Sequence, residues 1–167
     1  MIGKIKHFNE IPDFANSLYV QGPLDFFEED YLTGDAFLTT KDVLAKIGCL
    51  DPIFFGYFAD HDFGIRVRRA GFKLMVAKNA FAYHYQAANF DYLPAHERKR
   101  KLDDRWAKVH ENWARFKLKY QLPVDMLYPG TLNYLDWSNL NSLQDNENLF
   151  VNPIDYSSFL VDHANQE

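Results

Sequence analysis

Asp60 and Asp62 are two acidic residues, two positions apart, in a setting where a carboxylate could do chemistry. They follow an apolar run rich in aromatic residues, and they open a segment that the sequence predicts to be a short basic helix. The unpaired N–H groups and the positive dipole at a helix start keep nearby carboxylates ionised. An ionised carboxylate is able to act as a general base. The alternative is that both acids only cap the helix and stabilise it.

Arg66, His84 and His61 are the other side chains with reactive groups near these acids. Arg66 stands four residues after Asp62, so the two can pair across one helical turn, which would be a structural role. His84 lies within a Tyr-His-Tyr triplet, where it could bind a metal ion or form a hydrogen bond inside the core. His61 lies between the two acids and is interpreted as their solvated neighbour.

Short helices and strands must position these residues. A helix is predicted over residues 60–70, with Gly71 ending it, because Phe63, Val67 and Ala70 form an apolar stripe. A second short helix is predicted over residues 41–47, with Thr40 as its N-cap and Gly48 as its stop. Strands are predicted over residues 31–39, 73–77 and 80–85, and residues 25–30 are predicted to be a loop.

A long amphipathic helix is predicted over residues 95–120, opened by Pro94 and ended by Pro123. Its apolar positions alternate in steps of four and three, which predicts that they pack on the domain. They are Leu102, Trp106, Val109, Trp113, Phe116 and Tyr120. The remaining residues, 123–167, are polar and interrupted by prolines, which predicts an extended tail that wraps the domain or a partner.

The composition is that of an ordinary globular chain, with 167 residues, 47% hydrophobic, which predicts one domain. The net charge of −5 argues against a nucleic-acid partner. Aromatic residues make up 17%, and they are predicted to be mostly core, with stacking on sugar or base rings as the functional alternative. Cys49 is the only cysteine, so no disulfide can form within the chain and a reducing, cytoplasmic setting is expected. Residues 1–10 lack the apolar core of a signal peptide, and no apolar run approaches the ~18 residues of a transmembrane helix.

The segments between residues 30 and 90 together resemble the second half of the catalytic domain in family-2 glycosyltransferases of the GT-A fold. That family has, in order, a Gly-Ala segment, a Gly-Gly-Phe-Asp segment, a Glu-Asp-x-Asp segment with a following Arg, a Gly, and a strand ending in His. The matching pieces here are Gly34-Asp35-Ala36, Gly48 to Phe55, Ala59-Asp60-His61-Asp62, Arg66, Gly71 and His84. Ala59 stands where the family usually has Glu.

The resemblance implies an α/β fold, the C-terminal part of a Rossmann-like, nucleotide-diphospho-sugar transferase GT-A domain over residues 1–122, followed by the tail at 123–167. It implies that Asp60 is the catalytic base and that His84 binds the metal ion or a diphosphate oxygen. The residues that it places on the acceptor side are Gly34, Asp35, Asp62 and Arg66.

The implied activity is sugar transfer with inversion, from a nucleotide-sugar donor to a hydroxyl of a glycan or a lipid-linked acceptor. No counterpart of the family's N-terminal nucleotide-binding half, or of its donor-side Asp-x-Asp motif, is visible in the sequence, so activity is expected only with a donor-half polypeptide. A divalent metal ion, Mn²⁺ or Mg²⁺, is expected only in that complete active site. The expected location is the cytoplasm, including attachment to the inner face of a membrane. The alternative function is a truncated, non-catalytic interaction or carbohydrate-binding domain.

Overall fold

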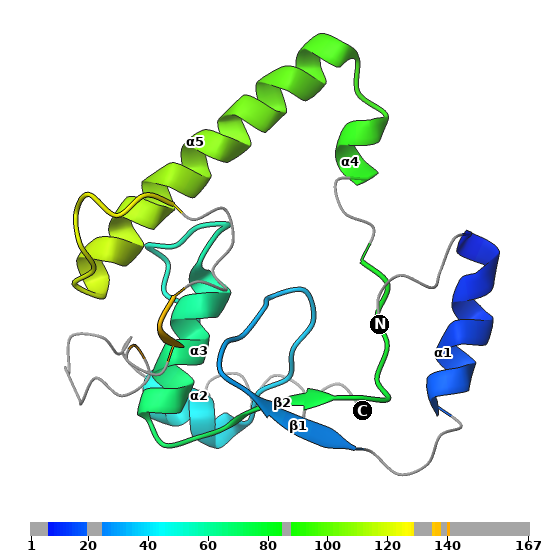
Figure 1. Cartoon of the computed structure of the whole chain (residues 1–167), viewed down its shortest axis with the longest axis horizontal. Helices are drawn as coiled ribbons and strands as arrows, with labels where there is room; N and C mark the ends of the chain where they lie inside the picture. The colour runs from blue at the N-terminus through cyan, green and yellow to red at the C-terminus, as the bar shows by residue number, and fades with distance from the viewer. Residues whose placement is uncertain (1–6, 20–24, 85–87, 129–134, 138–139, 141–167) are drawn as a thin grey trace, which may run out of the picture.

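The computed structural model describes residues 7–19, 25–84, 88–128, 135–137 and 140. Helices dominate this part of the chain, with one small sheet among them (Figure 1). In chain order the elements are η2 (Phe8–Glu10), α1 (Ile11–Tyr19), β1 (Phe26–Glu29), α2 (Lys41–Ile47), α3 (Ala59–Arg69), β2 (Leu74–Ala77), α4 (Ala88–Asp91) and α5 (Ala95–Lys119).

The sheet of the described residues is a two-stranded antiparallel ribbon of β1 and β2, with Phe26 opposite Ala77 and Glu29 opposite Leu74. The loop predicted over residues 25–30 was therefore wrong, because it contains β1. Its acidic residues are compatible with a strand because cations neutralise them: Glu28 accepts hydrogen bonds from Arg68 at 2.7 Å and pairs with Lys73 at 3.0 Å.

Two predicted strands are not strands in the structure. Residues 31–39 form turns and irregular backbone, with the Leu38 side chain fully exposed. The physical reason lies at Gly34, whose N–H donates to a side chain of α3 instead of joining a sheet ladder. Residues 80–84 are also irregular, and Tyr85 lies outside the described residues.

The two short helices form where the sequence predicts them. Thr40 caps α2 by accepting a hydrogen bond from the N–H of Val43, and Gly48 ends it with a φ of 76°. α3 ends at Arg69, and Gly71 follows with a φ of 86°, a backbone conformation that glycine adopts without steric cost. Both predictions of a helix with a glycine stop are confirmed.

Phe58 turns the chain into α3 in a left-handed conformation, with a φ of 70°. Such a conformation costs a non-glycine residue roughly 1–3 kcal/mol and persists only where the surroundings enforce it. Here the ring of Phe58 is buried and packs on Trp113 and Phe116, with centroids 5.8 Å and 5.4 Å away. Ring burial against α5 therefore holds the start of α3 in place.

Two apolar clusters meet on α3. One cluster joins α3, through Ile65, to α5 and to Leu135, Trp137 and Leu140. The other joins α3, through Phe63 and Val67, to α2 and β2. Figure 1 shows α3 lying between α2 and the C-terminal half of α5. α3 therefore buries two of its faces, one in each cluster.

α5 confirms the predicted long helix, but only its C-terminal half packs as predicted. Val109, Trp113, Phe116 and Tyr120 are buried, whereas Trp106 is 51% exposed. Figure 1 shows the N-terminal half of α5 extending away from α2 and α3 toward α4. The predicted packing of Trp106 was wrong because this part of the helix lies away from α3, against which the buried positions pack (Figure 1).

Part of the tail packs on the domain. Leu135, Trp137 and Leu140 are buried and belong to the cluster between α3 and α5. The backbone carbonyl of Leu140 accepts a hydrogen bond from Arg69 Nε at 2.7 Å. The other residues of the predicted tail after Tyr128 lie outside the described part of the chain, apart from Asp136. None of the described helices has the length and apolar character to cross a membrane.

Replacing Trp113 and Trp106 by alanine tests this division of α5. Trp113→Ala should lower the free energy of unfolding by ~3–5 kcal/mol, because it opens a cavity in the core. Trp106→Ala is the matched control and should cost less than ~1 kcal/mol, because half of the side chain is already in water. Urea denaturation of the full chain measures both values. Equal losses for the two variants would contradict the packing of α5.

Candidate functional site

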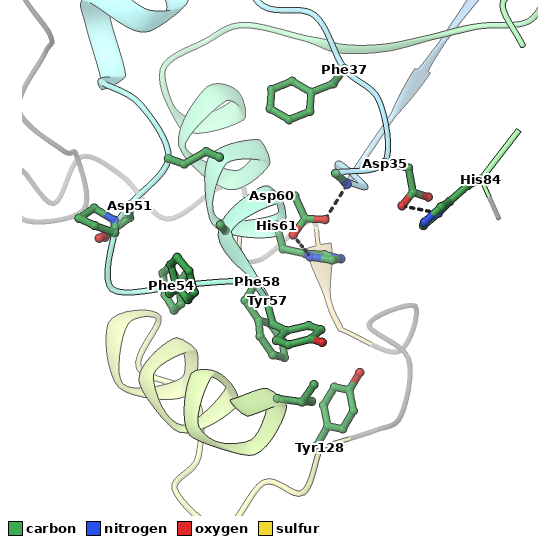
Figure 2. A pocket seen from close by; sticks show the side chains of 17 residues that line it. Asp35, Phe37, Asp51, Phe54, Tyr57, Phe58, Asp60, His61, His84 and Tyr128 are labelled. Atoms are coloured by element: carbon green, nitrogen blue, oxygen red, sulfur yellow. Dashed lines mark hydrogen bonds and ion pairs between the residues drawn. The ribbon is translucent and has the colours of Figure 1, made fainter. Parts of the chain in front are cut away.

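A cavity with a volume of about 720 Å³ opens at the N-terminal end of α3. Polar residues stand along one side of it: Gly34 and Asp35 from the loop after β1, Asp60 and His61 from α3, and His84 (Figure 2). The rest of the lining is largely aromatic. These rings belong to Phe37, Phe54, Phe55, Tyr57, Phe58 and Tyr128.

α5 fixes the aromatic wall of this cavity by binding the backbone of the loop that carries it. Asn112 donates from Nδ2 to the carbonyl of Phe55 at 3.1 Å, and Arg115 donates to the carbonyl of Ile53 at 2.8 Å. Asn112 is buried, so its hydrogen bond stabilises the loop without competition from water.

Asp60 lies in the first turn of α3 and has a partner on each carboxylate oxygen. Oδ2 accepts from the N–H of Gly34 at 2.7 Å, and Oδ1 lies 2.8 Å from Nδ1 of His61. A Cβ atom at position 34 would stand 2.9 Å from the Cβ of Asp60, which is too close. Glycine is needed at position 34 because the side chain of Asp60 approaches the backbone there.

The carboxyl group of Asp60 is ionised at neutral pH. Burial raises its pKa, but the hydrogen bond and the charge of His61, with the backbone N–H groups of His61 and Gly34, outweigh burial and hold the pKa below its ordinary value of 3.8. The predicted position of Asp60 at a helix start is confirmed, and the structure places this residue in the lining of the cavity.

His84 and Asp35 form a second acid–histidine pair on the same cavity. Nδ1 of His84 lies 3.0 Å from Oδ1 of Asp35, and more than half of each side chain is exposed. His84 is not at a strand end, as had been expected, because β2 ends at Ala77 and the backbone after it is irregular. The structure nevertheless brings Asp60, Asp35, Gly34 and His84 to one cavity.

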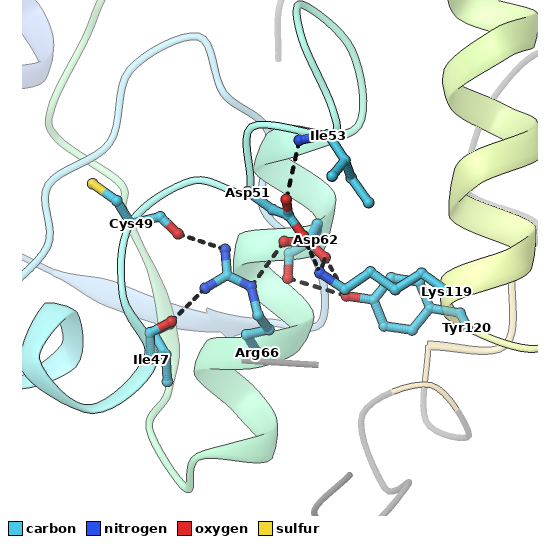
Figure 3. Close-up of polar contacts among 8 residues, drawn as sticks. All are labelled: Ile47, Cys49, Asp51, Ile53, Asp62, Arg66, Lys119 and Tyr120. Atoms are coloured by element: carbon cyan, nitrogen blue, oxygen red, sulfur yellow. Dashed lines mark hydrogen bonds and ion pairs between the residues drawn. The ribbon is translucent and has the colours of Figure 1, made fainter. Parts of the chain in front are cut away.

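Asp62 and Arg66 do not line the cavity, so their predicted place on the acceptor side is corrected. Both are fully buried, and Arg66 Nε donates to Asp62 Oδ2 at 2.8 Å (Figure 3). The two amino groups of Arg66 donate to the carbonyls of Ile47 and Cys49 at 2.8 Å and 2.7 Å. Arg66 therefore takes the structural role that its spacing from Asp62 had left open.

His61 was interpreted as a solvated neighbour of the two acids, which was wrong, because only 17% of its side chain is exposed. Its ring lines the cavity and lies close to the rings of Tyr31 and Trp137, with centroids 6.5 Å and 5.9 Å away. The direct succession of an acid and a histidine was the available signal. Trp137 is distant in sequence, and nothing in the sequence indicated that it would reach this place.

The described residues do not make a metal site by themselves. No group of three or more His, Cys, Asp or Glu side chains among them is arranged to hold a metal ion. His84 has one carboxylate neighbour, Asp35. The residues placed by the structure thus do not fit a resident Mn²⁺ or Mg²⁺ ion within this chain.

No protein-family model, curated protein or solved structure matches the chain. The functional interpretation accordingly depends on the geometry of this cavity and on the order of motifs in the sequence.

Acid titration tests the environment of Asp60. The pKa of Asp60 is lower in the folded chain than its ordinary value of 3.8. The ionised carboxylate therefore contributes its full stabilisation of the folded state above pH 3.8. That contribution is lost as the pH falls below 3.8 and through the folded pKa. Asp60→Asn should therefore reduce the free energy of unfolding at neutral pH and make little difference at strongly acidic pH. Urea denaturation over this range measures the gap between the two proteins. A gap that does not change with pH would contradict the assignment.

Removal of Asp62 tests the buried network. Asp62→Ala leaves the Arg66 guanidinium buried without its carboxylate, which should cost ~3–5 kcal/mol of unfolding free energy. The matched control is Asp103→Ala, which breaks the exposed ion pair with Lys99 on α5 and should leave stability nearly unchanged. Denaturant melts of the two variants give the comparison, and a small loss for Asp62→Ala would show that the network is not needed.

Proposed function

We propose that this chain is the acceptor-side half of an inverting GT-A glycosyltransferase, with the carboxylate of Asp60 providing the basic part of its site. The observation that carries the proposal is the meeting of motif residues from three separate segments at one cavity: Gly34 and Asp35, Asp60, and His84. Inverting transfer needs a base that takes the proton of the acceptor hydroxyl, and the proposal is supported by an ionised carboxylate, Asp60, in the lining of the cavity.

The size and lining of the cavity suit a sugar. Its volume of about 720 Å³ lies within the range of small-ligand sites, roughly 300–1,000 Å³. Tyr57 and Tyr128 offer ring faces with polar tips, which suit the apolar faces and the hydroxyl groups of a pyranose. Asp35 and His84 add exposed polar groups that could fix its orientation.

The proposed partners are a nucleotide-sugar donor, a glycan or lipid-linked acceptor, and a separate donor-half polypeptide. The donor half would bring the nucleotide site and the ligands that complete a Mn²⁺ or Mg²⁺ site beside His84. The proposed location is cytoplasmic, at the inner face of a membrane for a lipid-linked acceptor. Arg100 and Lys101 are exposed near the start of α5 and could contact anionic lipid.

The second candidate function is carbohydrate binding without catalysis. The observation that favours it is the exposed aromatic surface beside the cavity, where Phe55 is 78% exposed. Under this alternative the cavity would bind a glycan, and substitution of Asp60 would change affinity without any associated turnover.

Paired variants test the proposed function. The isolated chain should give negligible sugar transfer, and a candidate donor half added with Mn²⁺ should restore it. In that assembly, Asp60→Asn should lower kcat at least ~100-fold while donor binding stays within a few-fold, because only proton removal is affected. His84→Ala should instead weaken donor binding.

Nucleotide-sugar titrations and turnover assays separate these effects, with His96→Ala as a control far out on the surface, where 82% of the side chain is exposed. Robust transfer by the pure chain, or full activity of Asp60→Asn in the assembly, would overturn the proposal. Glycan binding with no transfer under any donor would favour the second candidate.

A further inference from the structure

The ring of His61 is held on several sides. Its Nδ1 lies 2.8 Å from the carboxylate of Asp60, and its plane is within 2° of that of Tyr31 and 22° of that of Trp137. Tyr31 and Trp137 also stack on each other at 5.4 Å, so the three rings form one cluster. Only 17% of the His61 side chain is exposed. Rotation of the imidazole is therefore restricted, and its orientation is set by Asp60 and these rings.

The other ring nitrogen, Nε2, has no hydrogen-bond partner among the described residues, and His61 lines the cavity. Figure 2 shows the ring directed from Asp60 toward the side of the cavity where Asp35 and His84 lie. Hydrogen bonding of Nδ1 to a carboxylate keeps the proton on Nδ1 and leaves the lone pair on Nε2. A hydroxyl group in the cavity can thus meet a fixed, unpaired imidazole nitrogen.

Asp60 is less well suited to receive that proton directly. Both of its oxygens already accept hydrogen bonds, from the N–H of Gly34 and from His61, and those bonds favour the ionised form. A general base works best when its pKa lies near the operating pH. The ordinary pKa of an imidazole is closer to neutral pH than the pKa of a stabilised carboxylate. In an aspartate–histidine pair, the carboxylate orients the imidazole and stabilises the imidazolium that forms.

We propose that His61 Nε2 is the atom that accepts the proton of the acceptor hydroxyl, and that Asp60 acts as its positioning residue. The inference rests on the proposed function. As the acceptor oxygen bonds to the anomeric carbon of the nucleotide sugar, the bond from that carbon to the diphosphate oxygen breaks. The electron pair leaves with the nucleoside diphosphate, and the hydroxyl proton moves to Nε2. The resulting imidazolium is paired with the Asp60 carboxylate until water takes the proton.

The tautomer of His61 in the isolated full chain is the first test, and it needs no substrate. Long-range ¹H–¹⁵N correlation spectra should show neutral His61 with its proton on Nδ1, and His96, which is 82% exposed, with the ordinary Nε2–H form. Asp60→Asn should abolish the preference at His61. Asp35→Asn, the matched control, removes the carboxylate from the other pair and should leave His61 unchanged. An Nε2–H tautomer at His61 in the unmodified chain would overturn the proposal.

Turnover in the assembly with a donor half is the second test. His61→Gln should lower kcat by about 10²–10⁴-fold, the usual contribution of a general base, with KM for the acceptor changed only a few-fold. His96→Gln, the control at a histidine that is 82% exposed, should leave kcat unchanged. If transfer occurs but His61→Gln retains more than about a tenth of kcat, the proposal fails while the glycosyltransferase function stands. If no donor half restores transfer, the proposed function fails, and the tautomer spectra still decide whether His61 is held as a base.

Discussion

A buried carboxylate, Asp62, is the group on which the rest of this structure depends. It accepts hydrogen bonds from Arg66 Nε and the Tyr120 hydroxyl, and it pairs with Lys119 Nζ at 2.6 Å. Arg66 extends the network to the backbone at Ile47 and Cys49. A buried charge is tolerated only when it is paired and hydrogen-bonded, so α2, α3 and α5 must keep one arrangement to satisfy it. Burial and the Asp62 charge raise the pKa of Tyr120, which therefore stays a hydrogen-bond donor.

The network decides which acid of α3 reaches the cavity. Successive residues turn by about 100° around a helix, so acids two positions apart point in nearly opposite directions. Asp62 points into the core, and Asp60 consequently points to the cavity, where Gly34 and His61 complete its hydrogen bonds. One short motif thus supplies one carboxylate to the core and one to the cavity, and the orientation of α3 links the two positions.

The cavity is assembled from segments with little regular structure, so its shape depends on what holds them. The aromatic loop is attached to α5 by Asn112 and Arg115, and the loop after β1 is attached to α3 by the hydrogen bond from Gly34 to Asp60. Trp137 closes the cluster behind His61. The contacts that hold these loops on the core also set the shape of the cavity. A substitution that disturbs the core packing will therefore change the cavity as well.

The sequence by itself determined the helices, because their signals are local. Thr40 and Gly48 delimit α2, Gly71 follows α3, and the apolar spacing predicts α5. The strand predicted over residues 73–77 is confirmed as β2, Leu74–Ala77. Tertiary structure alone decided strand β1, the exposure of Trp106 and the burial of Arg66, since each depends on which distant segment lies alongside. The same holds for the site. The motif order indicated Asp60 and His84, but the placement of the His61 ring follows from the approach of Tyr31 and Trp137. These contacts join residues far apart in the chain, so no local pattern encodes them.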